Sequence, residues 1–305
     1  MTRRGATSLV GILPIDKPAG LTSHDVVARV RRLTGEGRVG HAGTLDPMAT
    51  GVLVVLIGAY ARLAPFLTSA TKSYEATITF GTETDTDDAD GTAVRKAAVP
   101  PEVLDPEYAR KVLDSMVGPS SQVPPVYSAI KVAGRTAHRA ARAGEPIAME
   151  PRDIEVFAAK LVAIDPALPA WRVDFTVSKG TYVRALARDL GHMCETAAHL
   201  SALRRTTSGA LALPSAHTIA EVESAVAAGS LDRLLADPVT ALGLPVIESC
   251  GREVLTGAPM PAPAGLALPE GANVAIRRAG RFSAVYRLDS GRLMPAAVFP
   301  GGDAQ

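Results

Sequence analysis

The sequence has little cysteine, almost no net charge and no long apolar run, and each shortage excludes a class of protein. Two cysteines among 305 residues, Cys194 and Cys250, are too few for a disulfide framework and lack the spacing of a metal site. Because 32 basic residues face 31 acidic ones, the net charge is +1; a nucleic-acid surface would have to be a local patch. This composition fits the reducing cytoplasm best.

No segment is apolar over a length that would cross a membrane. The longest apolar stretch, GVLVVLIGAYARLAPFL, is interrupted by Arg62 and Pro65. The N-terminal MTRRGATSLVGILPIDKP is broken by Pro14 and Asp16 before a secretory core develops. Hydrophobic residues nevertheless make up 47% of the chain, which is enough for a sizeable core. We therefore expect a soluble cytoplasmic protein, with one large domain or a large and a small one.

Hydrophobic periodicity predicts strands mixed with helices over most of the chain. A short strand is followed by a helix that Thr22 or Ser23 caps and Gly35 ends, and further helices are expected at 104–118, 181–194 and, with basic character, within 122–147. Strands are expected at 51–58, 74–81, 152–164 and 170–180. This mixed order predicts an α+β fold with a mixed, largely antiparallel central sheet.

The composition changes from about Asp237 onward. APMPAPAGLALPEG is rich in Pro, Ala and Gly. NVAIRRAGRFSAVYRLDSGRLMPAAVF then reads as three short strands separated by AG and DSG turns. We therefore predict two domains, 1–236 and 237–305, of which the second is a small β domain.

The dipeptide Asp-Pro occurs at four places, beginning at Asp46, Asp105, Asp165 and Asp237. An Asp at a helix N-cap followed by Pro is an ordinary helix start, and 104–118 is predicted to be such a helix. Asp46 differs because three glycines flank it and a strand follows it. The residues alone leave Asp46 open between a turn residue and a catalytic carboxylate on an exposed loop.

The run GHAGTLDPMATGVL (40–53) closely resembles the catalytic motif of the bacterial TruB family, the tRNA pseudouridine-55 synthases, whose usual form is GHTGTLDP followed by ATGVL. Ala42 stands where the family usually has Thr, so one hydroxyl beside the site is lost. Further matching segments follow the family's order: DKPAGLTSHDVV, KSYEATITFGTETDTDDADG, PPVYSAIKVAGRTAHRAARAG, SKGTYVRALARDLG and HLSALRRTTSG. The resemblance covers about Gly11 to Ala210 and implies a pseudouridine-synthase fold; residues 237–305 resemble a PUA-type RNA-binding module.

The resemblance implies three catalytic residues. Asp46 is the essential carboxylate, Tyr74 stacks on the target base and mediates proton transfer, and Arg184 is ion-paired with the carboxylate. An Arg close to a carboxylate lowers its pKa by roughly 1–3 units, which would keep Asp46 ionised at neutral pH. Without the resemblance, the pattern favours a half-buried strand aromatic for Tyr74 and an exposed helix residue for Arg184.

Substrate contacts are implied for six more residues. They are His41 beside the flipped nucleotide, Tyr182 and Leu203 as walls of the base pocket, and Lys131, Arg139 and Arg142 in an RNA-gripping insertion at about 122–152. Without the resemblance, His41 could equally be a structural turn residue. The insertion and residues 179–205 are both rich in Lys and Arg, and such runs are usually solvated faces. Two of them in a nearly neutral chain indicate a local phosphate-binding surface.

The acidic loop ETDTDDADG (83–91) does not fit a calcium loop. Counted from Asp85, the third ligand position is Ala89, and Gly91 comes one residue late. We expect a solvated acidic turn without chemistry, and no metal or cofactor.

The leading functional hypothesis is isomerisation of uridine-55 to pseudouridine in the T-arm loop of tRNA by a monomeric enzyme. A tRNA-folding chaperone, with the isomerase activity secondary, is the alternative from another class. A small-molecule carboxylate hydrolase is weaker, because it lacks a second placed carboxylate and gives the basic helix no use. Whether Asp46 attacks the sugar or removes a sugar proton is left open by the sequence.

Overall fold

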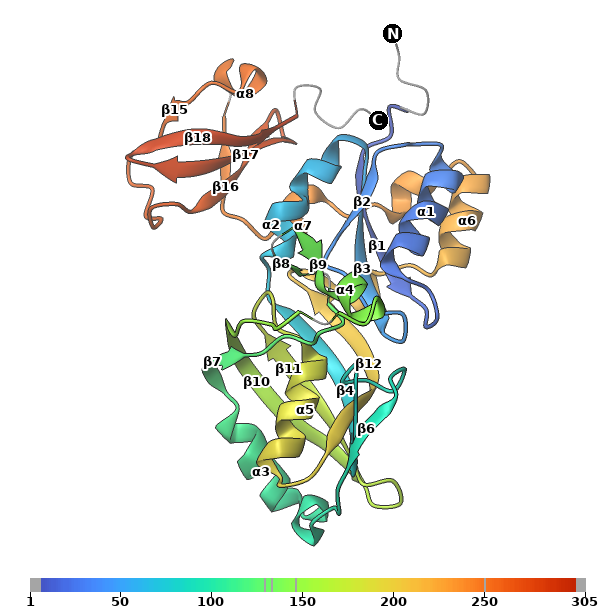
Figure 1. Ribbon diagram of the computed structural model, residues 1–305. Helices are drawn as coiled ribbons and strands as arrows, with labels where there is room; N and C mark the ends of the chain where they lie inside the picture. The colour runs from blue at the N-terminus through green and yellow to red at the C-terminus, as the bar shows by residue number, and fades with distance from the viewer. Residues whose placement is uncertain (1–6, 129, 133, 146, 250, 300–305) are drawn as a thin grey trace. The chain divides into compact units, whose positions relative to one another are not determined.

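The computed structural model describes residues 7–128, 130–132, 134–145, 147–249 and 251–299 (Figure 1). The chain forms two compact units, each assembled from separate stretches of sequence. Unit 1 contains the described parts of Met1–Pro47, Gly51–Ser69 and Thr207–Gln305, and unit 2 those of Met48–Thr50 and Ala70–Thr206. Most of unit 2 is therefore inserted, in sequence, between two parts of unit 1.

The buried strand β3 (Thr50–Ile57) organises the N-terminal part of unit 1. Every residue from Gly51 to Ile57 is buried, as the apolar β-branched run predicts. β3 pairs antiparallel with β1 (Gly11–Lys17) and with β2 (Val39–Ala42). The backbone of β1 also bonds to the late part of the chain: Asp16 N–H donates to His217 O at 2.9 Å, and Ala236 N–H donates to Ile12 O at 2.8 Å.

Helix α1 (Ser23–Thr34) begins and ends where its sequence signals predict. Thr22 is the N-cap residue; its hydroxyl accepts the Asp25 N–H, and the Asp25 carboxylate accepts the Thr22 N–H. Gly35 ends the helix with a left-handed φ of 67°. The other helical segments of this part of unit 1 are η1 (Gly58–Leu63), α2 (Ala64–Thr68), η3 (Leu213–Ser215), α6 (Ile219–Ala227), η4 (Leu231–Leu234) and α7 (Pro238–Leu242).

A second sheet confirms the small C-terminal β structure. Its strand order is β14 (Val246–Glu248), β16 (Asn273–Arg278), β17 (Arg281–Asp289), β18 (Arg292–Val298) and β15 (Met260–Pro261). The three strands predicted from the AG and DSG turns are β16, β17 and β18, and β14 runs parallel to β16. Val274, Ile276 and Tyr286 of these strands form a buried cluster with Val254 of helix α8 (Glu253–Thr256). The domain boundary at 237 stays a prediction.

The sheet of unit 2 has the strand order β12 (Ala198–Ser208), β4 (Lys72–Phe80), β11 (Ala170–Val177), β10 (Arg152–Asp165) and β7 (Gly118–Gln122). In β4, Tyr74, Ala76, Ile78 and Phe80 are buried and the residues between them are not, which confirms the alternating pattern. Helix α5 (Val183–Met193) packs on β4 and helix α3 (Pro106–Ser115) on β10 (Figure 1). Trp171 is fully buried in this core, and its indole N–H donates to Val103 O at 2.7 Å.

Short elements complete unit 2. They are the paired strands β5 (Thr82–Thr84) and β6 (Ala93–Lys96), η2 (Pro101–Leu104), the paired strands β8 (Lys131–Val132) and β9 (Arg135–Thr136), and α4 (Ala137–Arg142). Burial raises the pKa of the Cys194 thiol to about 11, and Cys250 lies outside the described residues. Among the described residues, we find no helix with both the length and the apolarity needed to span a bilayer.

The cap of α3 gives a direct test of the Asp-Pro helix start. The Asp105 carboxylate accepts the Glu107 N–H at 2.8 Å, and Pro106 is the first helical residue. Asp105→Ala should lower the free energy of unfolding by about 1 kcal/mol, because the N–H loses its acceptor. Urea unfolding measures the change, with the exposed Asp114→Ala on the same helix as the control. Equal stability of the two variants would contradict the capping role.

Candidate active site

Asp46 lies in the loop between β2 and β3, is partly buried and begins no helix. Two of the three glycines around it have the left-handed backbone that favours glycine, Gly43 with a φ of 92° and Gly51 with a φ of 99°. Gly40 lies in β2 and is not among the positive-φ residues. Gly43 and Gly51 therefore allow the turn that carries Asp46 to adopt backbone conformations that other residues rarely adopt.

The loop is held by hydrogen bonds on both sides of Asp46. On one side, the Ser23 hydroxyl donates to Leu45 O at 3.0 Å and accepts the Leu45 N–H at 2.9 Å. On the other side, Pro47 O accepts from the Gly20 N–H at 2.8 Å and from Lys17 Nζ at 3.2 Å. A residue fixed before and after itself has little backbone freedom, so the position of Asp46 is set in advance.

Lys17 is the least expected member of this arrangement. Its side chain is fully buried, and besides Pro47 O its ammonium group donates to Pro18 O at 2.9 Å and to Leu21 O at 2.7 Å. A buried charge needs such acceptors to offset its lost hydration. No pattern in the sequence distinguishes this lysine from the others.

The other three Asp-Pro sites use their carboxylates for the backbone. Asp105 and Asp237 cap α3 and α7, and the Asp165 carboxylate accepts the Ala167 N–H at 2.9 Å in a turn. Because no helix starts at Asp46, the helix-cap interpretation does not apply there. His41 and Ala42 lie in β2; His41 is partly buried with its ring edge-on to His24 at 5.6 Å, and Ala42 is fully buried.

Unit 2 carries the other residues to which the family resemblance assigned roles in catalysis or in the base pocket. Tyr74 lies on β4 opposite Phe175 of β11 and is 7% exposed. Leu203 lies on the neighbouring strand β12 and is 8% exposed; it lines a pocket with residues that include Thr77, Arg172 and Arg204, but not Tyr74 or Tyr182. Tyr182 is the N-cap residue of α5, and Arg184 is the second residue of that helix.

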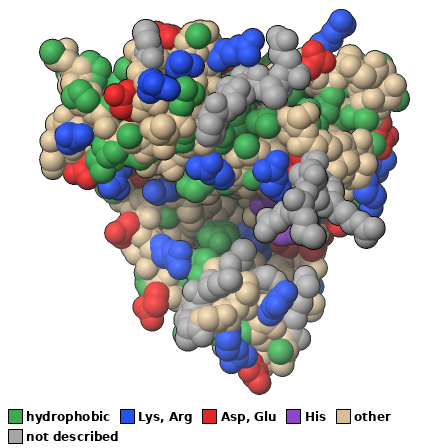
Figure 2. Space-filling view, turned by 90° about the horizontal axis from the view of Figure 1, so that it is seen from above, with side chains coloured by type: hydrophobic (Ala, Val, Ile, Leu, Met, Phe, Trp, Pro, Cys, Tyr) green, Lys and Arg blue, Asp and Glu red, His purple; other side chains and the backbone are tan. Residues whose placement is uncertain are grey.

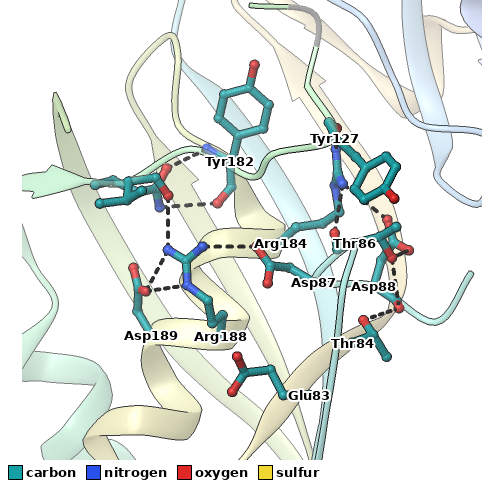
Figure 3. Close-up of polar contacts among 12 residues, drawn as sticks. Glu83, Thr84, Thr86, Asp87, Asp88, Tyr127, Tyr182, Arg184, Arg188 and Asp189 are labelled. Atoms are coloured by element: carbon teal, nitrogen blue, oxygen red, sulfur yellow. Dashed lines mark hydrogen bonds and ion pairs between the residues drawn. The ribbon is translucent and has the colours of Figure 1, made fainter. Parts of the chain in front are cut away.

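Arg184 is 4% exposed, so it is not an exposed helix residue. Its guanidinium donates to Thr86 O at 2.8 Å and to Tyr127 O at 2.9 Å, and lies 3.4 Å from the Asp88 carboxylate (Figure 3). The buried Asp88 therefore forms an ion pair with Arg184 of α5. The ion pair between Arg184 and Asp46 stays a prediction.

The expectation of a solvated acidic turn at 83–91 holds for the exposed Asp85 and Asp90 but was wrong for Asp87 and Asp88. Thr84, Asp87 and Asp88 are each at most 7% exposed. Asp87 Oδ2 lies 3.0 Å from Arg188 Nη1, and Arg188 follows Arg184 by one helical turn (Figure 3). Two of the five carboxylates of the loop are buried where α5 supplies two cations, a pairing across about a hundred residues that composition does not reveal.

The basic residues of the two predicted clusters differ in their exposure to solvent. Arg139 is exposed on α4, whereas Lys131 lies in β8 and Arg142 in α4 with side chains outside the described residues. Arg205 is 1% exposed, so it belongs to no solvated face. Figure 2 shows Lys and Arg side chains at many separate points of one face rather than in one continuous patch.

A buried lysine beside Arg205 had no sequence signal. Burial, followed by the charges of Arg205 and Lys179, lowers the pKa of Lys72 to about 8. Its ammonium group donates to Ala70 O at 2.7 Å. Within the described part of the chain, no three His, Cys, Asp or Glu side chains are grouped to hold a metal ion.

Comparison with known proteins gives consistent matches along the chain. Residues 31–183 match the TruB family pseudouridylate synthase N-terminal domain, and residues 184–242 match the tRNA pseudouridylate synthase B C-terminal domain. A tRNA pseudouridine synthase B of Geobacter sulfurreducens is 40% identical, over 90% of this chain and 92% of that protein. One of Mycobacterium tuberculosis (strain ATCC 25618 / H37Rv) is 42% identical, over 95% of this chain and 98% of that protein.

A solved structure shows the same fold at lower identity. A chain of the archaeal box H/ACA sRNP Nop10–Cbf5 complex superposes with a TM-score of 0.72 at 21% identity, covering 97% of this chain and 88% of that one. The expected pseudouridine-synthase fold is thereby confirmed.

The buried pair of Asp87 and Arg188 predicts a pH dependence of stability. Burial raises the pKa of Asp87 from 3.8 to about 6, more than Arg188 and Arg184 lower it. A raised pKa means that the protonated carboxyl favours the folded state, so its contribution is complete below about pH 4 and is lost as the pH rises through 6. Asp87→Asn stays neutral throughout and keeps a residue that tolerates the φ of 61°.

Between pH 4 and pH 7, the wild type should lose up to about 3 kcal/mol of unfolding free energy relative to Asp87→Asn. Urea unfolding at several pH values measures this difference, and Asp90→Asn, an exposed aspartate of the same loop, is the control. If the wild type instead gained on Asp87→Asn above pH 6, the attraction of Arg188 would outweigh burial.

Proposed function

The chain belongs to the TruB family of pseudouridylate synthases, and we propose on this premise that it converts uridine-55 in the T-arm loop of tRNA to pseudouridine, with Asp46 as the reagent. The observation that carries the proposal is the immobilised loop around Asp46. Ser23 fixes the residue before the carboxylate, and Lys17 and Gly20 fix the residue after it. The carboxylates of the other three Asp-Pro sites accept backbone N–H groups instead.

The reaction needs one ionised carboxylate held in place. It breaks the C–N glycosidic bond of uridine, turns the base and joins its C5 to the sugar, without a change of oxidation state. Asp46 serves either of two routes, attack on the sugar carbon or removal of a sugar proton, and both require the deprotonated form. Because the loop is fixed in advance, the carboxylate is already in position when the nucleotide binds. A mobile loop would first have to lose its conformational freedom.

The remaining catalytic roles are those that the family resemblance implies. We assign Arg184 the role of the cation that pairs with the Asp46 carboxylate, since an adjacent guanidinium stabilises a negative charge. Tyr74, largely buried on β4, supplies an aromatic surface and a hydroxyl for stacking and proton transfer. His41, Tyr182 and Leu203 form the surroundings of the turned base.

Binding of tRNA is assigned to basic residues outside this set. The target base must leave its stack at a cost of a few kcal/mol, which stacking and phosphate contacts offset. Residues 122–152 supply Lys131, Arg139 and Arg142 within a catalytic domain, 1–236. Residues 237–305 form a PUA-like RNA-binding domain, supported by a separate sheet that carries several arginines. We place the enzyme in the cytoplasm, where its tRNA substrate is, as a monomer.

Asp46→Asn should abolish turnover and leave tRNA binding intact. The amide is neither a base nor a nucleophile of comparable strength, so product formation should fall at least about a thousandfold. The dissociation constant for tRNA should stay within about threefold, since the change is isosteric. The assay detects a mass-neutral uridine isomer in the T loop of an unmodified tRNA transcript.

Asp105→Asn is the matched control, because it makes the same change in the other Leu-Asp-Pro tripeptide and keeps a good N-cap residue. Near-normal product formation by Asp46→Asn would exclude Asp46 as the reagent. A wild-type protein that binds tRNA and forms no isomer would overturn the proposed function itself.

A further inference from the structure

Gln122 makes an unusual pair of contacts with the backbone of Tyr182. It is the last residue of β7 and is 2% exposed. The Tyr182 N–H donates to Gln122 Oε1 at 2.9 Å, and Gln122 Nε2 donates to Tyr182 O at 3.2 Å. The side-chain amide thus presents one donor and one acceptor to a single residue, as a neighbouring strand would.

This pair fixes the backbone of the residue at which α5 begins. Tyr182 is extended, with φ −100° and ψ 111°, and makes no side-chain cap bond to α5. Its carbonyl also accepts the Leu186 N–H at 3.1 Å, the first bond of the helix. Two opposed hydrogen bonds allow the carboxamide only one orientation, so Gln122 fixes the backbone from which the Tyr182 side chain projects.

The chain after Gln122 is held to the same helix. Arg188 Nη2 donates to Val123 O at 2.9 Å, and Arg184 Nη2 donates to Tyr127 O at 2.9 Å (Figure 3). Arg184 and Arg188 are one turn apart and each is also paired with a carboxylate of the acidic loop. The segment 122–127 is therefore fastened to the start of α5 at three points.

We propose that Gln122 is a positioning residue that joins the root of the RNA-gripping insertion to the base pocket. It sets the backbone of Tyr182, and through that backbone the ring that walls the pocket. Because the insertion starts at Gln122, the same residue anchors both the RNA-binding insertion and the backbone of Tyr182 beside the target base. The inference rests on the proposed function, which assigns Tyr182 to the pocket and 122–152 to RNA.

Two variants separate this role from simple packing. Gln122→Met keeps the length of the side chain and removes both hydrogen bonds. Gln122→Glu, when ionised, keeps the acceptor but places a second acceptor against Tyr182 O; when protonated, it restores the donor and has nearly the shape of the amide. Ser121→Ala, an exposed position on the same strand, is the matched control.

At saturating tRNA, Gln122→Met should form pseudouridine about 10- to 100-fold more slowly, with a tRNA dissociation constant within threefold of the wild type. Ser121→Ala should equal the wild type. The activity of Gln122→Glu relative to the wild type should be low at pH 8 and should recover at least fivefold by pH 5.5. The charged groups around this site are Asp87, Asp88, Asp189, Arg184 and Arg188. The ratio to the wild type is the readout because pH effects that both proteins share cancel in it.

An unchanged saturating rate for Gln122→Met would overturn the proposal, as would a loss confined to tRNA affinity. If Gln122→Met does not fold, the Gln122→Glu ratio decides, and a ratio independent of pH would overturn the donor–acceptor role. The proposed function is judged separately, by whether the wild type forms pseudouridine in the same assay.

Discussion

A buried ammonium group must find acceptors, and in unit 1 this requirement shapes the loop that carries Asp46. Lys17 satisfies its charge with three backbone carbonyls, one of them from Pro47. The strand that carries Lys17 and the loop that carries Asp46 are thereby locked together, and Ser23 closes the other side. An unpaired charge in this position would be costly, so the loop cannot relax without exposing the lysine.

In unit 2 the buried charges that need partners are negative. The carboxylates of Asp87 and Asp88 are buried where α5 offers Arg188 and Arg184. The two guanidinium groups also donate to the carbonyls of residues 86, 123 and 127, so one turn of α5 holds two segments, the acidic loop and the start of the insertion. Charge pairing thus joins both segments to α5, while backbone hydrogen bonds of Asp87 and Ala89 with Leu200 join the acidic loop to β12.

The sequence predicted those elements whose pattern depends on contacts within the element itself. The β-branched run of β3, the alternation of β4 and the Asp-Pro start of α3 each report on contacts within one element, and each was predicted correctly. The motif around Asp46 likewise identified the family. The burial of Asp87, the fixation of Pro47 by Lys17 and the pairing of Gln122 with Tyr182 depend on partners 30 to about 100 residues away. Such pairs leave no periodicity, so the acidic loop was assigned to solvent and Gln122 was overlooked.

The pairing of β1 with the late chain has a consequence for synthesis on the ribosome. The N-terminal strand receives hydrogen bonds to His217 and Ala236 only after residues 70–206 have been made. Domains generally fold as units while the chain grows, and contacts of long sequence separation form slowly. Unit 2 can therefore fold during translation while β1 still awaits its last partners. The hydrogen bonds of β1 to the late chain are completed only after residue 236 has been made, whereas those that join Lys17 to Pro47 and Ser23 to Leu45 need no late partner.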